Sequence, residues 1–262
     1  MVVLFWFGAI FGSFAGAVAW RLKNKKDFVR GRSECEQCHH TLAPLDLVPI
    51  VSWVVLRGKC RYCKQRIGND VLLLELGLGT AFALSYISWP LGFGEWLPVV
   101  LFGIWLAVLV VFAILFVYDL RWTLLPDRLV FPLIALALVF FAGRMVLEGV
   151  AFSHVLFEGL LALTPIAGLY ALLYFVSNGK WVGFGDVKLG IALGLLLGWQ
   201  QALLALVLAN FIGLLFVLPG LVRKKLKTTS RVPFGPCLMA ATFAAFLYGS
   251  QIIRAYMNVL LA

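Results

Sequence analysis

The chain has 262 residues, of which 63% are hydrophobic and only 13% are charged. A soluble domain is about half apolar and about a quarter charged, and one core of this length cannot bury so much apolar surface. The composition therefore excludes a soluble globular protein, a disordered tail, a coiled coil and a secreted disulfide scaffold. It leaves an all-α polytopic membrane protein with one modest soluble insert.

Eight segments are apolar and long enough to be considered as membrane helices. They are Val2–Trp20, Val71–Ser88, Leu97–Tyr118, Leu129–Leu147, Val155–Val176, Val187–Gly198, Gln201–Leu221 and Pro236–Met257. The first runs directly into Arg21 and Lys23 without a small-residue cleavage site, so we expect a retained helix instead of a signal peptide. The predicted organisation is a first membrane helix at 1–20, a soluble insert at 21–70 and a helical catalytic domain at 71–262.

The basic residues are strongly one-sided. Twenty of the 22 Lys and Arg fall in segments that share one side if eight helices alternate, namely 21–70, 119–128, 177–190 and 221–235. By the positive-inside rule that side is cytoplasmic, so both termini face outward. Topology and contact with membrane lipid account for the net charge of +10, and we expect no nucleic-acid partner.

The sixth segment is short for a membrane helix. From Asp186 to Trp199 a helix rises about 20 Å, whereas the hydrocarbon layer is about 30 Å thick. If Trp199 lies at the outer interface, Asp186 lies inside the membrane zone. A carboxylate is tolerated there only beside a water-filled or protein-lined cavity.

The insert carries two C-x-x-C pairs twenty-one residues apart, Cys35 with Cys38 and Cys60 with Cys63. Two such pairs can complete a tetrahedral four-sulfur site for zinc, with no open position for catalysis. Because the cytosol is reducing, we expect structural Zn²⁺ and not disulfides, with a redox pair or unmetallated thiols as alternatives. We expect His39 and His40 to be surface residues, and Cys237 to be a small buried hydrophobe.

Four acids lie at the cytoplasmic ends of predicted membrane helices: Glu75, Asp119, Asp127 and Asp186. If Asp119 and Asp186 meet, they cannot both ionise cheaply and will share a proton. Such a pair can activate water as a base and protonate a leaving group as an acid. Gly183 and Gly185 precede Asp186, and glycine allows close approach of an extended peptide.

A purely structural role is the alternative for each of these acids. Aspartate is a favoured helix N-cap, which suits Asp127 best and also fits Asp186. Asp119 could meet only water or Arg121 at an interface. Glu75 lies within a predicted span and has no capping role, so it is a functional candidate, with a hydrogen bond to a neighbouring helix as the simpler explanation.

The motifs, in this order, resemble those of the type IV prepilin peptidases, which are bifunctional leader peptidases and N-methyltransferases. They are Gly12-Ser13-Phe14, the two Cys pairs, Pro49, Ser52-Trp53, Leu56-Arg57-Gly58-Lys59-Cys60, Glu75, Asp119-Leu120-Arg121, Leu125-Pro126-Asp127, Gly183-Phe184-Gly185-Asp186-Val187-Lys188-Leu189 and Pro233-Phe234-Gly235-Pro236. The resemblance covers nearly the whole chain. One Gly-x-Gly-Asp motif would be weak evidence, but the ordered set is specific.

The resemblance implies an intramembrane aspartic endopeptidase of the bacterial inner membrane, with Asp119 and Asp186 as its catalytic pair. Its substrates would be type IV prepilins and pseudopilins, whose basic leader is cut after a glycine on the cytoplasmic side. A second activity would methylate the new N-terminus using S-adenosylmethionine. Supporting roles would fall to Asp127, Glu75, Gly183, Gly185 and Lys188.

The sequence departs from the family pattern in its first third. Gly16 replaces a common asparagine, Glu36 a common proline, and Asn69–Leu72 a usual Arg-Tyr-Pro stretch. Both aspartate motifs are unaffected, so these departures bear on methylation and substrate preference more than on proteolysis. No glycine-rich methyl-donor loop is recognisable, and the residues that bind S-adenosylmethionine remain unknown.

Three other functions fit part of the pattern. A proton-coupled transporter would use the acids as a relay, but the sequence lacks the expected inverted repeats. A membrane scaffold would use the cysteine insert to dock a partner. A presenilin-like protease shares the two aspartate motifs, but here Pro-Phe-Gly-Pro precedes the last helix where that class has Pro-Ala-Leu.

Overall fold

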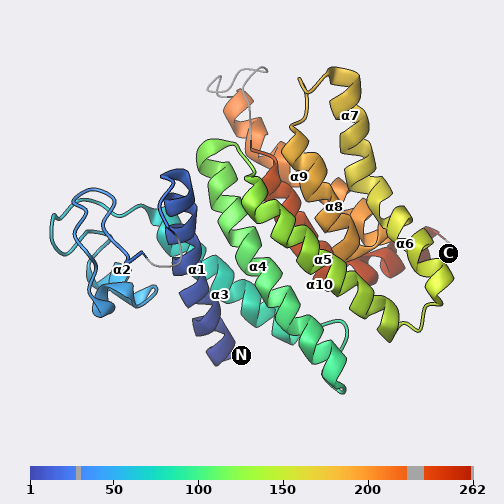
Figure 1. The fold of residues 1–262 in the computed structure, drawn as a ribbon, viewed down its shortest axis with the longest axis horizontal. Coiled ribbons are helices and arrows are strands. Elements are labelled where there is room, and N and C mark those ends of the chain that lie inside the picture. Colours follow the sequence, from blue (N-terminus) through green and yellow to red (C-terminus); the bar gives the residue numbers. More distant parts are fainter. Residues whose placement is uncertain (28–30, 223–232, 261–262) are drawn as a thin grey trace. The chain divides into compact units, whose positions relative to one another are not determined.

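The computed structural model describes residues 1–27, 31–222 and 233–260. Within these ranges the chain is helical and has no β-strand beyond isolated bridges (Figure 1). Its elements are α1 (Val2–Lys23), η1 (Pro44–Leu47), α2 (Val51–Val55), α3 (Asn69–Ile87), α4 (Trp96–Trp122), α5 (Asp127–Leu147), α6 (Phe152–Leu163), η2 (Thr164–Gly168), α7 (Leu169–Ser177), α8 (Phe184–Leu197), α9 (Trp199–Val222) and α10 (Gly235–Leu260).

Seven helices of the described chain are long and apolar enough to cross a membrane. They are Val2–Lys23, Asn69–Ile87, Trp96–Trp122, Asp127–Leu147, Ser153–Ser177, Trp199–Leu218 and Gly235–Val259. The predicted all-α, multi-pass membrane fold is therefore confirmed. The sixth predicted segment is helix α8, whose 14 residues are too few to cross a bilayer alone. The basic residues predicted in the loop before α10 lie outside the described part of the chain.

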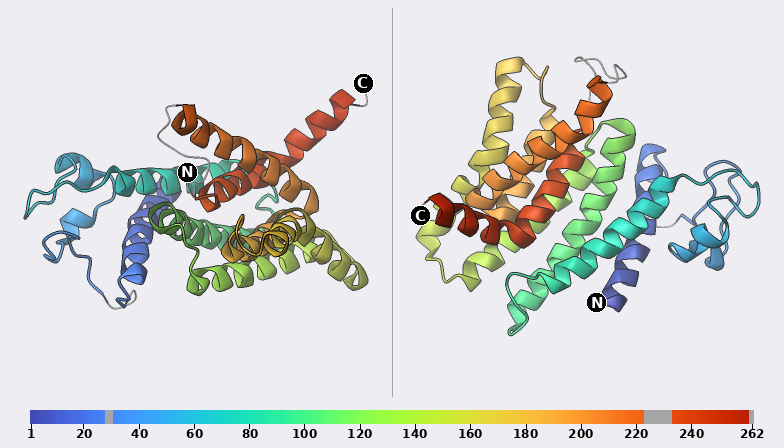
Figure 2. Two further views of the ribbon diagram at one scale, coloured as in Figure 1. Left: turned by 90° about the horizontal axis from the view of Figure 1, so that it is seen from above. Right: turned by 180° about the vertical axis from the view of Figure 1, so that it is seen from behind.

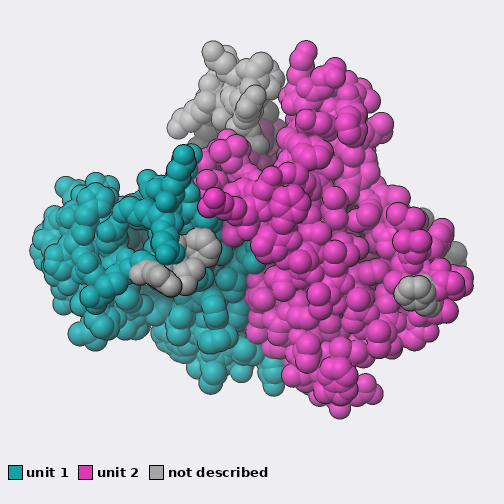
Figure 3. Space-filling model, in the orientation of Figure 1, with its two compact units in different colours: residues 1–88, 109–117 teal, residues 89–108, 118–262 magenta. Residues whose placement is uncertain are grey.

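The chain divides into two compact units (Figure 3). Unit 1 comprises residues 1–88 and 109–117, and unit 2 comprises residues 89–108 and 118–262. The cysteine insert belongs to unit 1, between the end of α1 and the start of α3. Both aspartates of the predicted catalytic pair belong to unit 2.

In unit 1, helices α1 and α3 lie side by side in both sets of views (Figures 1 and 2). Glycines allow this close packing, because a Cβ on Gly8 would lie 2.9 Å from the Cα of Gly79. A Cβ on Gly12 would lie 2.8 Å from the Cα of Glu75. Small residues spaced four apart are a common means of bringing membrane helices together. The predicted Gly-Ser-Phe motif therefore begins with a residue that the helix contact itself requires.

In unit 2, helix α8 is enclosed by the other helices and not by lipid. It contacts α5, α6, η2, α7, α9 and α10. Most of its residues from Val187 to Leu197 are buried. Gly190 allows a close approach, because a Cβ there would lie 3.0 Å from the backbone nitrogen of Ala167. A helix too short to span the bilayer is thereby kept within protein, as backbone in the membrane requires.

A wide helical turn interrupts the span that packs against α8. Between α6 and α7 the turn Thr164–Gly168 is a π-helix with Pro165 inside it. Proline lacks the N–H that a regular helical bond needs, so a local change of winding is expected there. The turn provides Ile166 and Ala167, both buried, where α8 makes its glycine contact.

Candidate active site and metal centre

Asp119 lies in the last turn of the long helix α4. Its side chain is buried, with 5% of the residue exposed. Helix α4 ends just after it, where Thr123 takes a left-handed φ of 50° and donates its N–H to the Asp119 carbonyl at 2.7 Å. The carboxylate is therefore held at the end of a membrane helix and inside protein.

The Asp119 carboxylate accepts a hydrogen bond from a backbone group far along the chain. The N–H of Gly235 donates to Asp119 Oδ2 at 3.1 Å, and both residues are buried. A Cβ on Gly235 would lie 2.7 Å from the same oxygen. Only glycine at position 235 therefore permits this contact, which explains the glycine of the Pro-Phe-Gly-Pro motif.

Asp186 lies in the first turn of α8, three residues after the N-cap residue Gly183. It is partly buried. A Cβ on Gly185 would lie 3.1 Å from Leu125, and a Cβ on Gly235 would lie 3.7 Å from the same leucine side chain. The structure thus places the glycine before Asp186 and the glycine that binds Asp119 against one residue, and the pairing of the two carboxylates stays a prediction. Gly183 is the N-cap residue of α8, and Pro126 is that of α5. Asp186 and Asp127 therefore lie inside the first turns of these helices and are not the N-cap residues.

The glycines before Asp186 lie where side chains would collide. A Cβ on Gly185 would lie 3.1 Å from Cβ of Leu125, and one on Gly183 would lie 3.3 Å from Oδ2 of Asp186. Leu125 belongs to the Leu-Pro-Asp sequence that precedes α5. The two aspartate motifs are therefore in direct contact through backbone and small side chains.

Asp127 and Lys188 form an ion pair beside the aspartates. Lys188 Nζ lies 2.7 Å from Asp127 Oδ1, with 19% of the lysine side chain and 56% of the aspartate side chain exposed. The ammonium also lies 5.3 Å from the ring centre of Phe131 and 5.1 Å from that of Phe184. This arrangement connects the start of α5 to the start of α8, two residues after Asp186. Both residues predicted to have supporting roles are thus found in one ion pair, and their roles stay predictions.

Two residues near the pair were not among the predicted site residues. Tyr170 of α7 is 6% exposed, and its ring centre lies 6.2 Å from that of Phe234, the residue before Gly235. The thiol of Cys237, two residues after Gly235, is also buried. Neither carries a motif signal, because a single tyrosine or cysteine in an apolar helix is usually packing. Cys237 is buried, as the sequence predicts.

Glu75 belongs to unit 1. The residue is 4% exposed, and its Oε2 accepts the N–H of Ile50 at 2.6 Å. The side chain of Ser13 also hydrogen-bonds the carboxylate. Glu75 therefore connects the insert to α1 and α3, which gives its burial a structural explanation.

The four predicted cysteines meet at one point of unit 1. Their sulfur atoms all lie within 4.8 Å of one another, and Cys35 Sγ lies 3.9 Å from Cys63 Sγ. Four thiolates at 2.3 Å around one zinc ion would be about 3.8 Å apart. Within the described chain no histidine joins this group. The cluster can hold one metal ion in a closed site.

The two Cys pairs have the same backbone geometry. The N–H of Cys35 donates to His40 O at 3.0 Å, and the N–H of Cys60 donates to Gln65 O at 2.8 Å. In each, the residue after the second cysteine has a positive φ, 55° at His39 and 60° at Lys64. Each pair is therefore a local turn that presents two sulfurs on one side.

The thiols differ in how readily they ionise. Burial opposes ionisation of Cys35, but backbone N–H groups of Cys38 and Gln37 outweigh it and lower the pKa to about 7. The N–H of Gln65 favours the Cys63 thiolate, but desolvation and the neighbouring thiols raise its pKa to about 11. A divalent cation would supply the positive charge that four adjacent thiolates need.

Asp46 holds the second cysteine turn to η1. Its carboxylate accepts hydrogen bonds from Arg61 Nε at 2.7 Å, from the Tyr62 hydroxyl at 3.2 Å and from the Ala43 N–H at 3.2 Å. Burial alone would raise the pKa of Asp46, but these donors hold it below its ordinary value. His40 stacks on Tyr62 with ring centres 3.6 Å apart. The ring of His40 therefore serves packing.

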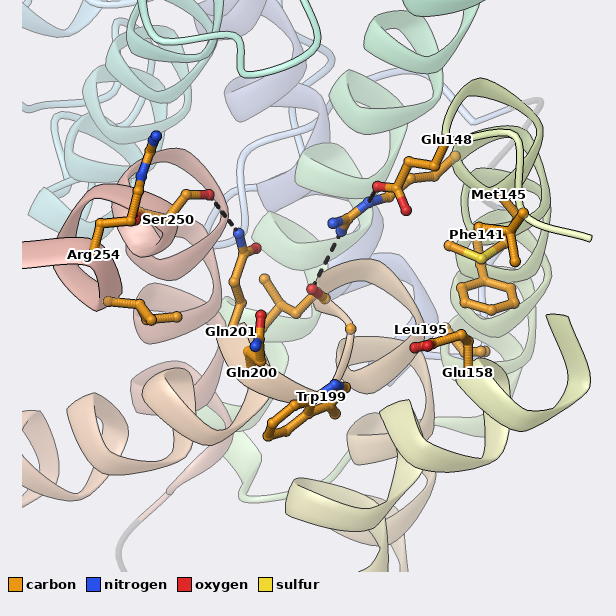
Figure 4. Close-up of a pocket in the computed structure, with 15 residues that line it drawn as sticks. Phe141, Met145, Glu148, Glu158, Leu195, Trp199, Gln200, Gln201, Ser250 and Arg254 are labelled. Carbon is orange, nitrogen blue, oxygen red and sulfur yellow. Dashed lines mark hydrogen bonds and ion pairs between the residues drawn. The ribbon is translucent and has the colours of Figure 1, made fainter. Parts of the chain in front are cut away.

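Unit 2 also has a hollow of about 450 Å³ at the opposite end of α8 (Figure 4). Arg144 donates there to Glu148 at 2.7 Å and to the Leu197 carbonyl at 3.3 Å, which satisfies the end of α8. From Asp186 to this end the helix rises about 17 Å. The hollow is therefore separate from the aspartate pair.

Comparisons with known proteins agree with these features. The bacterial peptidase A24 N-terminal domain matches residues 6–89, and the type IV leader peptidase family matches residues 106–218. No solved structure matches the chain.

Three similar proteins are each called prepilin leader peptidase/N-methyltransferase. That of Stutzerimonas stutzeri is 34% identical over 230 residues, which cover 86% of this chain and 75% of the relative. That of Pseudomonas aeruginosa is 33% identical, covering 88% and 77%. That of Bacillus subtilis is 31% identical, covering 99% and 98%. The chain therefore belongs to the type IV leader peptidase family.

Proposed function

We propose that the protein is an intramembrane aspartic endopeptidase that removes the leader from type IV prepilins or pseudopilins. Its second activity methylates the new N-terminal amine with S-adenosylmethionine as methyl donor. The names of its relatives support both activities. The catalytic pair is Asp119 and Asp186.

One observation carries the peptidase proposal. The buried carboxylate of Asp119 accepts the N–H of Gly235, and the glycine before Asp186 packs against Leu125, which also lies beside Gly235. A buried acid in a membrane helix is costly and marks a functional site by default. Two such acids placed together have the arrangement that aspartic proteolysis needs.

The pair performs hydrolysis by exchanging protons with the attacking water and with the scissile peptide group. One carboxylate accepts a proton from water as the water oxygen bonds to the scissile carbonyl carbon, and the other carboxyl group protonates the carbonyl oxygen. Proton transfer to the amide nitrogen then lets the C–N bond break, giving a carboxylic acid and a free amine. The bond from Gly235 fixes the rotamer of Asp119 throughout.

We place the protein in the bacterial inner membrane with the insert and both aspartates on the cytoplasmic side. The support is the distribution of Lys and Arg, of which eleven lie between residues 21 and 70. The basic leader of a prepilin would remain on this side, next to the catalytic pair.

The metal of the insert is Zn²⁺ in this proposal. Its ligands are the thiolates of Cys35, Cys38, Cys60 and Cys63, whose mutual distances fit a tetrahedral site. The ion would hold the two turns together and supply no chemistry to the peptide bond. The proposal names no residue that contacts S-adenosylmethionine.

The test is to incubate the purified protein with a synthetic prepilin N-terminal segment, with and without S-adenosylmethionine, and to measure products by mass spectrometry. Cleavage should occur in both reactions, and the mass of one added methyl group only with the donor. Cleavage without methylation would reject the second activity. An intact segment in both reactions, together with proton flux in vesicles, would favour a transporter instead.

A further inference from the structure

The cysteine insert has an apolar surface outside the membrane-spanning helices. Six aliphatic residues in and around η1 and α2 are exposed by 38% to 73%: Leu45, Leu47, Val48, Val51, Val54 and Val55. Isolated exposed aliphatic residues are ordinary, but a contiguous group on a small hydrophilic module marks a contact surface.

The three valines of α2 share one face. Val51, Val54 and Val55 have the spacing of neighbours on one side of a helix, and they are 44%, 58% and 70% exposed. Trp53, on the other side, lies against Gly58, where a Cβ would be 2.8 Å from the indole ring. The helix therefore packs on the insert through Trp53 and turns its valines outward.

A hydrogen bond fixes the start of α2 at a defined level of α3. The N–H of Ile50 donates to Glu75 Oε2 at 2.6 Å. Glu75 lies six residues after Asn69, the first residue of α3, which corresponds to about 9 Å of helix rise. Leu73, two residues before Glu75, is 67% exposed on a helix that is long and apolar enough to cross a membrane. The start of α2 is thus held beside the first two turns of a candidate membrane helix.

The charge around this surface suits an anionic lipid layer. The insert carries eleven Lys and Arg against five Asp and Glu between residues 21 and 70. Arg57 lies two residues after the end of α2, and Arg57 and Lys59 are both exposed. An apolar helix face bordered by basic residues binds the interface of a membrane, with its apolar side about 5–10 Å into the acyl boundary.

We propose that the segment from Pro44 to Arg57 is an interfacial element that inserts Val51, Val54 and Val55 into the anionic lipid leaflet on the insert's side of the membrane. The metal cluster is then held against the bilayer surface and does not move freely above it. This inference rests on exposure, charge and the Glu75 bond, and not on the proposed peptidase activity.

The test uses the full-length protein in nanodiscs that contain phosphatidylglycerol. A photoreactive p-benzoylphenylalanine replaces Val54 in one variant and Gln65 in the other, which is an exposed polar residue of the same insert. Lipid adducts measured by mass spectrometry should be at least tenfold more abundant at position 54. Equal yields at the two positions, or a protein adduct in place of lipid at position 54, would overturn the proposal.

A second arm tests the requirement for anionic lipid without a bulky probe. Hydrogen exchange of residues 51–57 should be several-fold slower in phosphatidylglycerol than in phosphatidylcholine nanodiscs. The double variant Val54→Asp and Val55→Asp should lose that difference while the exchange of α3 stays unchanged. Equal protection in both lipids, or protection that survives the double variant, would contradict the proposal.

Discussion

The cysteine insert and the aspartate site assemble their chemistry in opposite ways. Each cysteine turn closes within six residues, through backbone bonds such as that from Cys35 N–H to His40 O. The aspartate site instead joins Asp119 to Gly235, which is 116 residues away. The cluster of four cysteines depends on two local turns, whereas the aspartate site depends on the packing of several membrane helices. The two sites should therefore fail independently.

The largest effect is expected from removing one acid of the pair. Asp119→Asn or Asp186→Asn keeps the side-chain shape but removes a proton donor or acceptor, so cleavage of a prepilin segment should fall about 10³-fold or more. Rates should be measured by mass spectrometry on detergent-purified protein.

Glu95→Gln is the matched control, because Glu95 is exposed and lies at the other end of α4. It should cleave at the unaltered rate. The metal content of both aspartate variants should equal that of the parent protein. Full processing by either aspartate variant would eliminate the dyad.

The next effect separates the insert from the membrane helices. Changing all four cysteines to serine should abolish binding of about one zinc ion per chain, because serine hydroxyls do not replace thiolates as zinc ligands. Hydrogen exchange should speed up in residues 31–68 and remain unchanged in α8. Elemental analysis provides the metal content, and a native protein that folds normally without metal would contradict this prediction.

A methyl group beside the catalytic acid tests the geometry of the site. Gly235→Ala places a Cβ 2.7 Å from Asp119 Oδ2, and a shift of about 1 Å in a reacting group can cost about 100-fold in rate. We expect kcat to fall about 10-fold to 100-fold with metal content unchanged. Gly103→Ala in α4 is the control, since its Cβ would meet nothing within 4 Å. Equal activity of the two variants would show that Gly235 does not constrain Asp119.

The smallest effect concerns the ion pair of Asp127 and Lys188. Because more than half of the aspartate side chain is exposed, the pair should contribute only about 0.5–1 kcal/mol to stability. Lys188→Gln and Asp127→Asn should each reduce cleavage about threefold. In a double-mutant cycle the two losses should be less than additive, because either change removes the same contact. Strict additivity would argue that the residues act separately.

The span boundaries followed closely from hydropathy. The first predicted segment, Val2–Trp20, corresponds to α1 at Val2–Lys23, and the sixth, Val187–Gly198, to α8 at Phe184–Leu197. Hydropathy predicts the spans well because the hydrocarbon layer requires a long run of apolar residues in helical conformation at each crossing. It could not show that α8 is enclosed by protein, since a buried helix and a lipid-facing helix are equally apolar.

Other contacts carried no sequence signal at all. The rings of Tyr170 and Phe234 are one example. The hydrogen bond from the N–H of Ile50 to Glu75 is another. Residues of these types are common in such positions. Asp46 is one of several acids in the insert, and its carboxylate binds Arg61 and Tyr62. Partner choice among similar residues depends on chain path, and no local pattern encodes it.

The sequence by itself determined the membrane class, the approximate spans and the four cysteines of the cluster, because each follows from composition or from spacing within a few residues. Tertiary structure alone decided that Asp119 meets Gly235 and that the N–H of Ile50, at the start of α2, meets Glu75. The physical reason is the range of the interactions. Hydropathy and turn geometry act along the chain, whereas the meeting of distant residues depends on how closely glycine-bearing helices can pack.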